Sequence, residues 1–278
     1  MKKKKVLIGY DDFRDLIESG GYFVDKSLLI KELIDNSNKV TLITRPRRFG
    51  KSLNFSMLKY FWENPECRAT HPLLYRDVSH LFSGLAISRA GEEYMKEQGQ
   101  YPVIFFSFRG AKMNDWKNTS KMISSEIARE FKRHNYLLKG DNLSKQEKDD
   151  YTKIMYGKGD VSDYSQGILF LSEYLNRHFN KNVIVLIDEY DTPIQQAYLR
   201  DYFDDALDFF RPFLVEGLKG NDYLKRAVIT GIMKVAQESV FSSFNNPSVS
   251  TITSSAFSDK FGFTEEEVKE MLDYVGMS

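Results

Sequence analysis

Residues 40–52 read VTLITRPRRFGKS, and this stretch decides the fold. The β-branched run at 40–44 predicts a buried strand, and the basic, proline-containing stretch behind it can form neither strand nor helix. Helical spacing of apolar residues resumes at Lys51 and continues to Trp62. A strand, a glycine-ended loop and a helix therefore follow one another. In this arrangement the free backbone N–H groups and the positive dipole end of a helix bind an anion.

The end of this loop carries the residue types that phosphate binding needs. Gly50 lets the backbone approach a phosphate, Lys51 can reach the β- and γ-phosphates, and the Ser52 hydroxyl can ligate Mg²⁺. The usual pattern has a glycine five residues before Gly50, where this chain has Arg45. The alternative is a helix start whose basic side chains are merely solvated. The predicted nucleotide-binding residues are Arg45, Pro46, Arg47, Arg48, Phe49, Gly50, Lys51, Ser52 and Leu53.

A second motif lies at residues 183–191, which read VIVLIDEYD. An apolar strand that ends in two adjacent carboxylates is typical of a Walker B strand. We expect Asp188, together with Ser52, to hold a magnesium ion, and Glu189 to polarise the attacking water. The alternative is a solvated acidic turn, since such residues are good turn formers. Taken with the loop, the motif predicts a protein that binds a nucleotide and Mg²⁺, and no residue of the sequence discriminates ATP from GTP.

A third polar position follows another apolar run, at residues 227–232. Thr230 stands at the tip of this predicted strand, where a polar side chain can sense the γ-phosphate, and Lys234 lies just beyond it. A strand-end threonine that caps a turn is the alternative. The predicted catalytic residues are Lys51, Glu189, Thr230 and Lys234.

The remaining pattern alternates strands with helices. We expect a further strand at 102–108 and helices at 27–35, 115–131, 169–179, 203–218 and 264–274. Because the strands are unalternated apolar runs, the fold class is α/β, with a mainly parallel sheet covered by helices on both faces. Residues 22–24 are a candidate short strand. The polar stretch 139–165 has few apolar residues and is expected to be a surface insertion that can be partly helical.

Composition excludes several classes of protein. Among the 278 residues, 39 Lys and Arg balance 39 Asp and Glu, which argues against a uniformly basic nucleic-acid coat. The single cysteine, Cys67, excludes an internal disulfide, and we expect a buried thiol and a cytoplasmic location. The purest apolar run, 183–187, is far shorter than the roughly 20 residues that cross a membrane.

The sequence resembles the predicted AAA-ATPase-like family of bacteria. The similarity covers nearly the whole chain, and its most specific part is the RPRRFGK run at 45–51. It implies a P-loop NTPase fold, a three-layer α/β/α sandwich of the additional-strand, catalytic-glutamate type. Residues 1–250 would form the nucleotide-binding domain, and 251–278 the start of a truncated helical lid or linker. The segments that carry the resemblance are 22–27, 44–54, 101–108, 186–193, 230–234, 238–246 and 261–267.

The resemblance also bears on function. The family's loop carries arginine at the position of Arg45, whereas the family usually has arginine where this chain has Lys234. Its members commonly continue into a nuclease-like domain, which we do not find before Ser278, so this chain is expected to be a fragment or a stand-alone module.

Three functions remain open. The first is an ATPase that acts as a switch or motor for a partner, such as a nuclease-like domain. The others are a regulatory module that binds nucleotide without hydrolysis, and a small-molecule kinase, which Glu189 disfavours because kinases must exclude water. A nucleic-acid role rests on family analogy alone, and an oligomer is compatible with all three.

Overall fold

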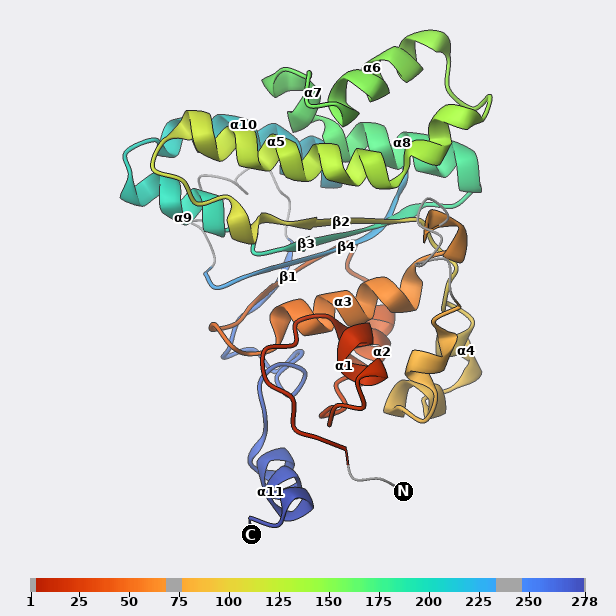
Figure 1. Cartoon of the computed structure of the whole chain (residues 1–278), viewed down its shortest axis with the longest axis vertical. Helices are drawn as coiled ribbons and strands as arrows, with labels where there is room; N and C mark the ends of the chain where they lie inside the picture. The colour runs from red at the N-terminus through yellow and green to blue at the C-terminus, as the bar shows by residue number, and fades with distance from the viewer. Residues whose placement is uncertain (1–3, 69–76, 234–246, 278) are drawn as a thin grey trace.

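The computed structural model describes residues 4–68, 77–233 and 247–277, and its centre is a sheet of five parallel strands (Figure 1). The strand order is β2-β3-β4-β1-β5, so the fifth strand lies at one edge and the second at the other. The parallel α/β prediction is therefore confirmed. The strands are β1 (Val40–Thr44), β2 (Val103–Ser107), β3 (Val183–Asp188), β4 (Leu224–Gly231) and β5 (Ser248–Ser250).

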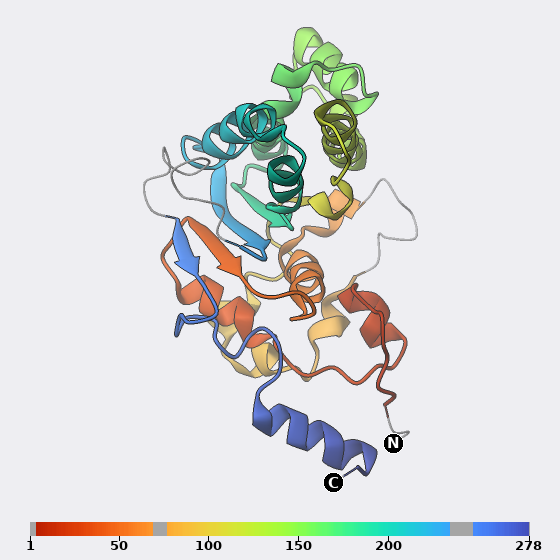
Figure 2. The same cartoon turned by 90° about the vertical axis from the view of Figure 1, so that its left-hand side faces the viewer.

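Helices cover both faces of the sheet (Figures 1 and 2). The lower face in Figure 1 carries α1 (Phe13–Glu18), α2 (Leu28–Asp35), α3 (Lys51–Trp62) and α4 (Glu92–Met95). The upper face carries α5 (Trp116–Arg133), α6 (Lys145–Met155), α7 (Val161–Ser165), α8 (Gly167–Phe179), α9 (Thr192–Leu199) and α10 (Phe203–Leu218). The last helix, α11 (Glu265–Val275), stands apart from both layers. Short 3₁₀ segments are η1 (Pro65–Arg68), η2 (Ser79–Phe82), η3 (Ala86–Arg89), η4 (Phe108–Gly110) and η5 (Asn135–Lys139).

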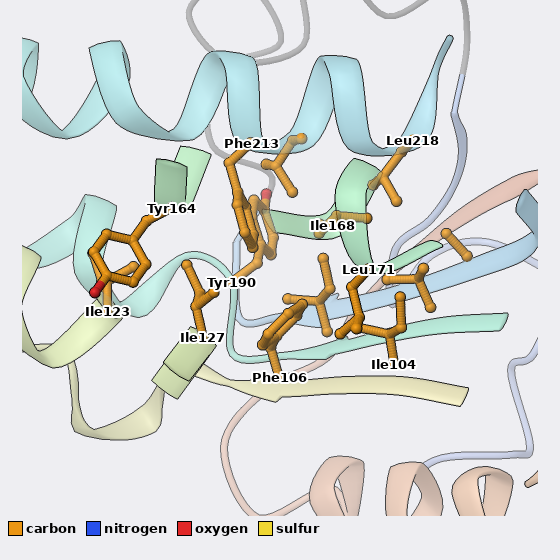
Figure 3. Packing of buried hydrophobic residues seen from close by; sticks show 14 of the residues in the cluster. Ile104, Phe106, Ile123, Ile127, Tyr164, Ile168, Leu171, Tyr190, Phe213 and Leu218 are labelled. Carbon is orange, nitrogen blue, oxygen red and sulfur yellow. The ribbon is translucent and has the colours of Figure 1, made fainter. Parts of the chain in front are cut away.

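The strands have no polar face because each side of the sheet meets helices. In β2, Ile104 and Phe106 point to the α5–α8–α10 side, where Figure 3 shows them beside Leu171 and Phe213. Val103, which precedes Ile104, belongs to the cluster on the α3 side, and the intervening Phe105 packs against that cluster. This two-sided burial is why the strands read as continuous apolar runs in the sequence.

Most predicted elements are confirmed, with boundaries that shift by a few residues. The helix predicted at 203–218 is α10, and the last helix starts with the expected capping box between Thr264 and Glu267. Cys67 is buried as expected. No strand forms at residues 22–24, since the neighbouring Gly21 makes only an isolated bridge with Lys5.

The stretch 139–165 is partly helical, as expected, but the expectation that it adds little to the core was wrong. This stretch forms α6 and α7 and contributes Tyr151, Ile154 and Tyr164 to the larger core. The Tyr151 hydroxyl donates to the Phe131 carbonyl oxygen of α5 at 2.7 Å. The few apolar residues of this stretch lie on one helix face. Its average composition is therefore polar although the element packs against the core. In the described part of the chain, no helix combines the length and apolarity that crossing a bilayer requires.

Candidate active site

The carboxyl edge of the sheet brings three polar side chains into one row. Ser107 on β2 pairs with Asp188 on β3, and Ile187 pairs with Ile229 on β4, which puts Thr230 level with Asp188. Alternation along the strands turns all three toward the α3 face. Asp188 is 1% exposed and Thr230 is fully buried. A polar floor therefore lies beneath the start of α3.

The loop between β1 and α3 closes around its own lysine. Arg48 and Gly50 both adopt left-handed backbone, with φ of 68° and 73°, which bends the loop into the first turn of α3. The buried Lys51 ammonium donates to the carbonyl oxygens of Arg45 at 3.1 Å and Pro46 at 2.9 Å. Burial lowers the pKa of Lys51, while the carboxylates after β3 oppose that shift. The ammonium is thus held beside the anion-binding end of the helix.

Ser52 and Asp188 join the loop to the third strand. The Ser52 Oγ donates to Asp188 Oδ2 at 2.7 Å, across 136 residues of sequence. The other carboxylate oxygen, Asp188 Oδ1, is buried without a hydrogen-bond partner among the described residues, and so is Thr230 Oγ1. Burial raises the pKa of Asp188 to about 6. A hydroxyl and a desolvated carboxylate with a spare oxygen fit a Mg²⁺ ion that shares its remaining ligands with phosphates.

Glu189 turns away from Asp188. Its backbone is left-handed, with φ of 54°, at the point where β3 ends. Glu189 Oε2 accepts a hydrogen bond from Thr192 Oγ1 at 3.2 Å, and Oε1 lies 3.7 Å from Arg109 Nε. The two adjacent carboxylates therefore face different partners, and Glu189 borders a cavity of about 540 Å³ that also reaches Lys51 and Ser52.

Arg45 has a different place from the one predicted. Its side chain is 2% exposed, and its guanidinium donates to the carbonyl oxygens of Thr44 at 2.9 Å, Ser250 at 3.0 Å and Phe257 at 3.0 Å. These contacts fasten β1 to β5 and to the segment after it. Only the backbone of Arg45 faces the loop, through the carbonyl that accepts from Lys51. The side chains of Arg47 and Arg48 are exposed, and Lys234 lies outside the described residues.

Sequence reasoning missed two residues of the site, Asp191 and Arg109. Asp191 is fully buried, and its Oδ2 accepts from the backbone N–H groups of Ile232 at 2.8 Å and Met233 at 2.9 Å. It thereby fixes the turn after Thr230. A Cβ on Gly231 would lie 2.6 Å from Asp191 Oδ1, so glycine is required there. The signal in the sequence was that each residue lies within three positions of the end of a strand.

Comparison with known proteins identifies the family of the chain. A family model described as "Predicted AAA-ATPase" matches residues 7–241. The chain belongs to this AAA-ATPase-like family. A relative from Azotobacter chroococcum mcd 1, described as "Uncharacterized protein in vnfD 5'region", is 26% identical over 270 residues. That match covers 96% of this chain and 45% of the relative, so the chain spans less than half of the relative's length. No solved structure matches.

Membership of the AAA-ATPase-like family suggests ATP binding, and a second cavity offers a place for the base. It has a volume of about 180 Å³ and lies on the other side of Gly50 from the Glu189 cavity. Residues 22–24, from the N-terminal part of the chain, line this cavity, and so do Phe263 and Met271 from the C-terminal part. Aromatic and aliphatic walls are what a flat heterocycle needs. The remaining wall residues include Phe49, Leu53 and Asn54.

We expect Arg45→Ala to destabilise this AAA-ATPase-like protein rather than to weaken phosphate contacts. Removal of the guanidinium leaves several buried carbonyl oxygens without a donor, at a cost of about 2–4 kcal/mol in the free energy of unfolding. The exposed neighbour provides the control, because Arg47→Ala should change this free energy by less than about 0.5 kcal/mol. Urea denaturation of both variants measures the difference. Equal stability of the two variants would contradict the structural role of Arg45.

The raised pKa of Asp188 predicts a pH-dependent stability. The folded-state pKa lies above the unfolded value, so ionisation costs the folded state, and stability falls as pH rises from about 4 through about 6. Asp188→Asn removes this cost and should stabilise the nucleotide-free protein by about 1–3 kcal/mol at pH 7.5, with little effect at pH 4. The exposed Asp208 supplies the control, Asp208→Asn, which should be neutral at both pH values. Denaturation that shows Asp188→Asn to be the less stable protein at pH 7.5 would refute this reading.

Proposed function

We propose that this protein binds ATP with Mg²⁺ at the carboxyl edge of its sheet and hydrolyses it. One observation carries the proposal, namely the 2.7 Å hydrogen bond between Ser52 Oγ and Asp188 Oδ2 beside the unpartnered Asp188 Oδ1. It joins the helix start after β1 to the acidic end of β3. A serine and an aspartate held together at a phosphate-binding loop are the ligands that a nucleotide-bound Mg²⁺ takes from a protein.

The strand order supports the additional-strand, catalytic-glutamate type of P-loop fold. The loop strand β1 and the acidic strand β3 are separated by β4, and each pairs with β4 in parallel. The inserted strand puts Thr230 between the loop and Asp188. In this position a hydroxyl can contact both the γ-phosphate and the attacking water.

Each residue of the site then has a separate task. Lys51 would exchange its two loop carbonyls for phosphate oxygens, and Ser52 and Asp188 would hold the metal. When bound, Mg²⁺ neutralises charge that develops on the β- and γ-phosphate oxygens. Glu189 would accept a proton from the water that attacks the γ-phosphorus. The bond between this phosphorus and the bridging oxygen breaks, and ADP leaves with that oxygen. Because Pro46 lacks an N–H group, Arg47 or Arg48 would supply a further donor to phosphate.

The C-terminal segment would cover the base. α11 is tied to the N-terminal side by an ion pair of 2.5 Å between Lys26 Nζ and Glu267 Oε1. The rings of Tyr22 and Tyr274 also lie 4.6 Å apart. Met271 of this helix faces the cavity that we assign to the base. These contacts support the role of residues 251–278 as a helical lid over the nucleotide.

A second function, nucleotide binding without turnover, is favoured by the contacts of Glu189. Its carboxylate accepts a hydrogen bond from Thr192 Oγ1 and lies 3.7 Å from Arg109 Nε, so protein groups already face both of its oxygens. In that case the site would act as a regulatory switch for a partner. A nuclease-like domain beyond this chain is one partner that fits, since the Azotobacter relative is more than twice as long as the aligned part.

A nucleotide titration of the full chain tests the proposal. Fluorescent ATP and GTP analogues are titrated with and without Mg²⁺, and phosphate release is then followed over time. We expect tighter binding of ATP with Mg²⁺ than without it, followed by turnover. Binding without phosphate release would exclude hydrolysis and leave the nucleotide-dependent switch as the function. Failure of both nucleotides to bind would reject the site.

A further inference from the structure

Arg109 connects three parts of the site that the sequence keeps far apart. It lies in η4, directly after β2, and its side chain is 48% exposed. Nη2 donates to Ser52 Oγ at 2.7 Å, and Nη1 donates to Asp11 Oδ2, just before α1, at 2.6 Å. Nε lies 3.7 Å from Glu189 Oε1. One guanidinium therefore contacts the serine of the loop, the glutamate after β3 and the N-terminal segment.

The contact between Arg109 and Ser52 conflicts with the binding of a metal ion to the same serine. The Ser52 hydroxyl gives its proton to Asp188 and accepts from Arg109, so the guanidinium already takes up one of its two lone pairs. A divalent cation ligated by the same oxygen would stand within a few ångströms of this positive charge. Two cations at that separation repel each other. Arg109 and a metal therefore cannot both be bound to Ser52 in their best positions.

We propose that Arg109 takes the place of the metal's positive charge in the nucleotide-free protein and becomes a γ-phosphate ligand in the loaded one. This inference rests on the proposed function. Arg109 leaves Ser52 when the site is loaded. Of the two cavities that it lines, its destination is the one of 540 Å³, because Lys51 and Glu189 line that cavity as well. Its forked donors suit phosphate oxygens. Its departure also removes the guanidinium that lies 3.7 Å from Glu189 Oε1, so this oxygen then faces the cavity without that neighbour.

The alternative is a structural salt bridge in which Arg109 only anchors Asp11. The two roles differ in how Mg²⁺ dependence responds to substitution. If Arg109 competes at Ser52, then Arg109→Ala should lower the Mg²⁺ concentration for half-maximal binding of a fluorescent ATP analogue. We expect a decrease of roughly fivefold, the scale of one like-charge contact at a partly exposed site. A purely structural bridge gives no reason for Mg²⁺ to act at lower concentration.

The same variant should hydrolyse ATP more slowly, even though it needs less Mg²⁺. Loss of an arginine from the transferred phosphate is expected to reduce kcat by about 10²–10³-fold, near the lower end of the range for such arginines. Arg109→Lys keeps the positive charge without the forked donors, so its kcat should lie between that of the parent and that of Arg109→Ala. Arg129→Ala is the matched control, because Arg129 lines the neighbouring 400 Å³ cavity and its side chain is 71% exposed and paired with Glu126. Thermal unfolding of each variant confirms that it is folded.

The outcomes separate this inference from the proposed function. A lowered Mg²⁺ midpoint together with a reduced kcat supports both roles of Arg109. A midpoint and kcat that match those of Arg129→Ala would overturn the inference while the ATPase stands. A lowered midpoint with parental kcat would overturn the γ-phosphate contact. If the parent protein itself binds no nucleotide, the proposed function fails first.

Discussion

Replacement of Glu189 by glutamine should leave ATP binding within about twofold of the parent and lower the hydrolysis rate by roughly 10²–10⁴-fold. Glutamine keeps the size of the side chain and can still contact the water, but it cannot accept the proton. Because Glu189 turns away from Asp188, toward Thr192, the substitution leaves the proposed metal ligands Ser52 and Asp188 in place. Single-turnover hydrolysis and equilibrium binding of a fluorescent ATP analogue measure the two quantities separately.

The chain offers a matched carboxylate as a control for this experiment. Glu126 on α5 is 17% exposed, and its carboxylate binds Arg129 and the backbone N–H of Ser107 rather than Ser52 or Asp188. Glu126→Gln should therefore hydrolyse ATP at close to the parental rate. A Glu189→Gln protein that hydrolyses as fast as Glu126→Gln would remove the hydrolytic mechanism and leave the nucleotide-dependent switch.

Truncation of Lys51 should abolish tight nucleotide binding. We expect Lys51→Ala to lose about 2–5 kcal/mol of binding free energy, because the phosphates would stay buried without their cation. The folded protein should survive, since the variant removes a desolvated ammonium whose partners in the nucleotide-free state are two loop carbonyls. Calorimetric titration with ATP and Mg²⁺ gives the affinity, and thermal unfolding without nucleotide gives the stability.

Lys112 serves as the control for Lys51. It is exposed and lines the same 540 Å³ cavity, but it lies beyond β2 and outside the loop. Lys112→Ala should bind ATP within about twofold of the parent. Affinity of Lys51→Ala equal to that of Lys112→Ala would show that the loop does not hold phosphate, and the proposed function would then be wrong.

The sequence alone determined the elements on which the site is built. The apolar run at 40–44, the basic loop and the helical spacing from Lys51 to Trp62 are local patterns, and so is the apolar run that ends at Asp188 and Glu189. Local periodicity follows from the backbone geometry of strands and helices, so it can be read without knowing what packs on what. The same holds for the limits of α10.

Tertiary structure alone decided how these elements meet. The position of β4 between β1 and β3 follows from packing across the whole chain, and the three-residue β5 is too short to leave a pattern. Arg45 looked like a phosphate ligand because its neighbours are basic, yet two of its acceptors, Ser250 and Phe257, lie more than 200 residues away. Arg109 reaches Ser52 across 57 residues and resembles any surface arginine in the sequence. Contacts between residues so distant in the chain have no periodicity, and only the folded sheet brings them together.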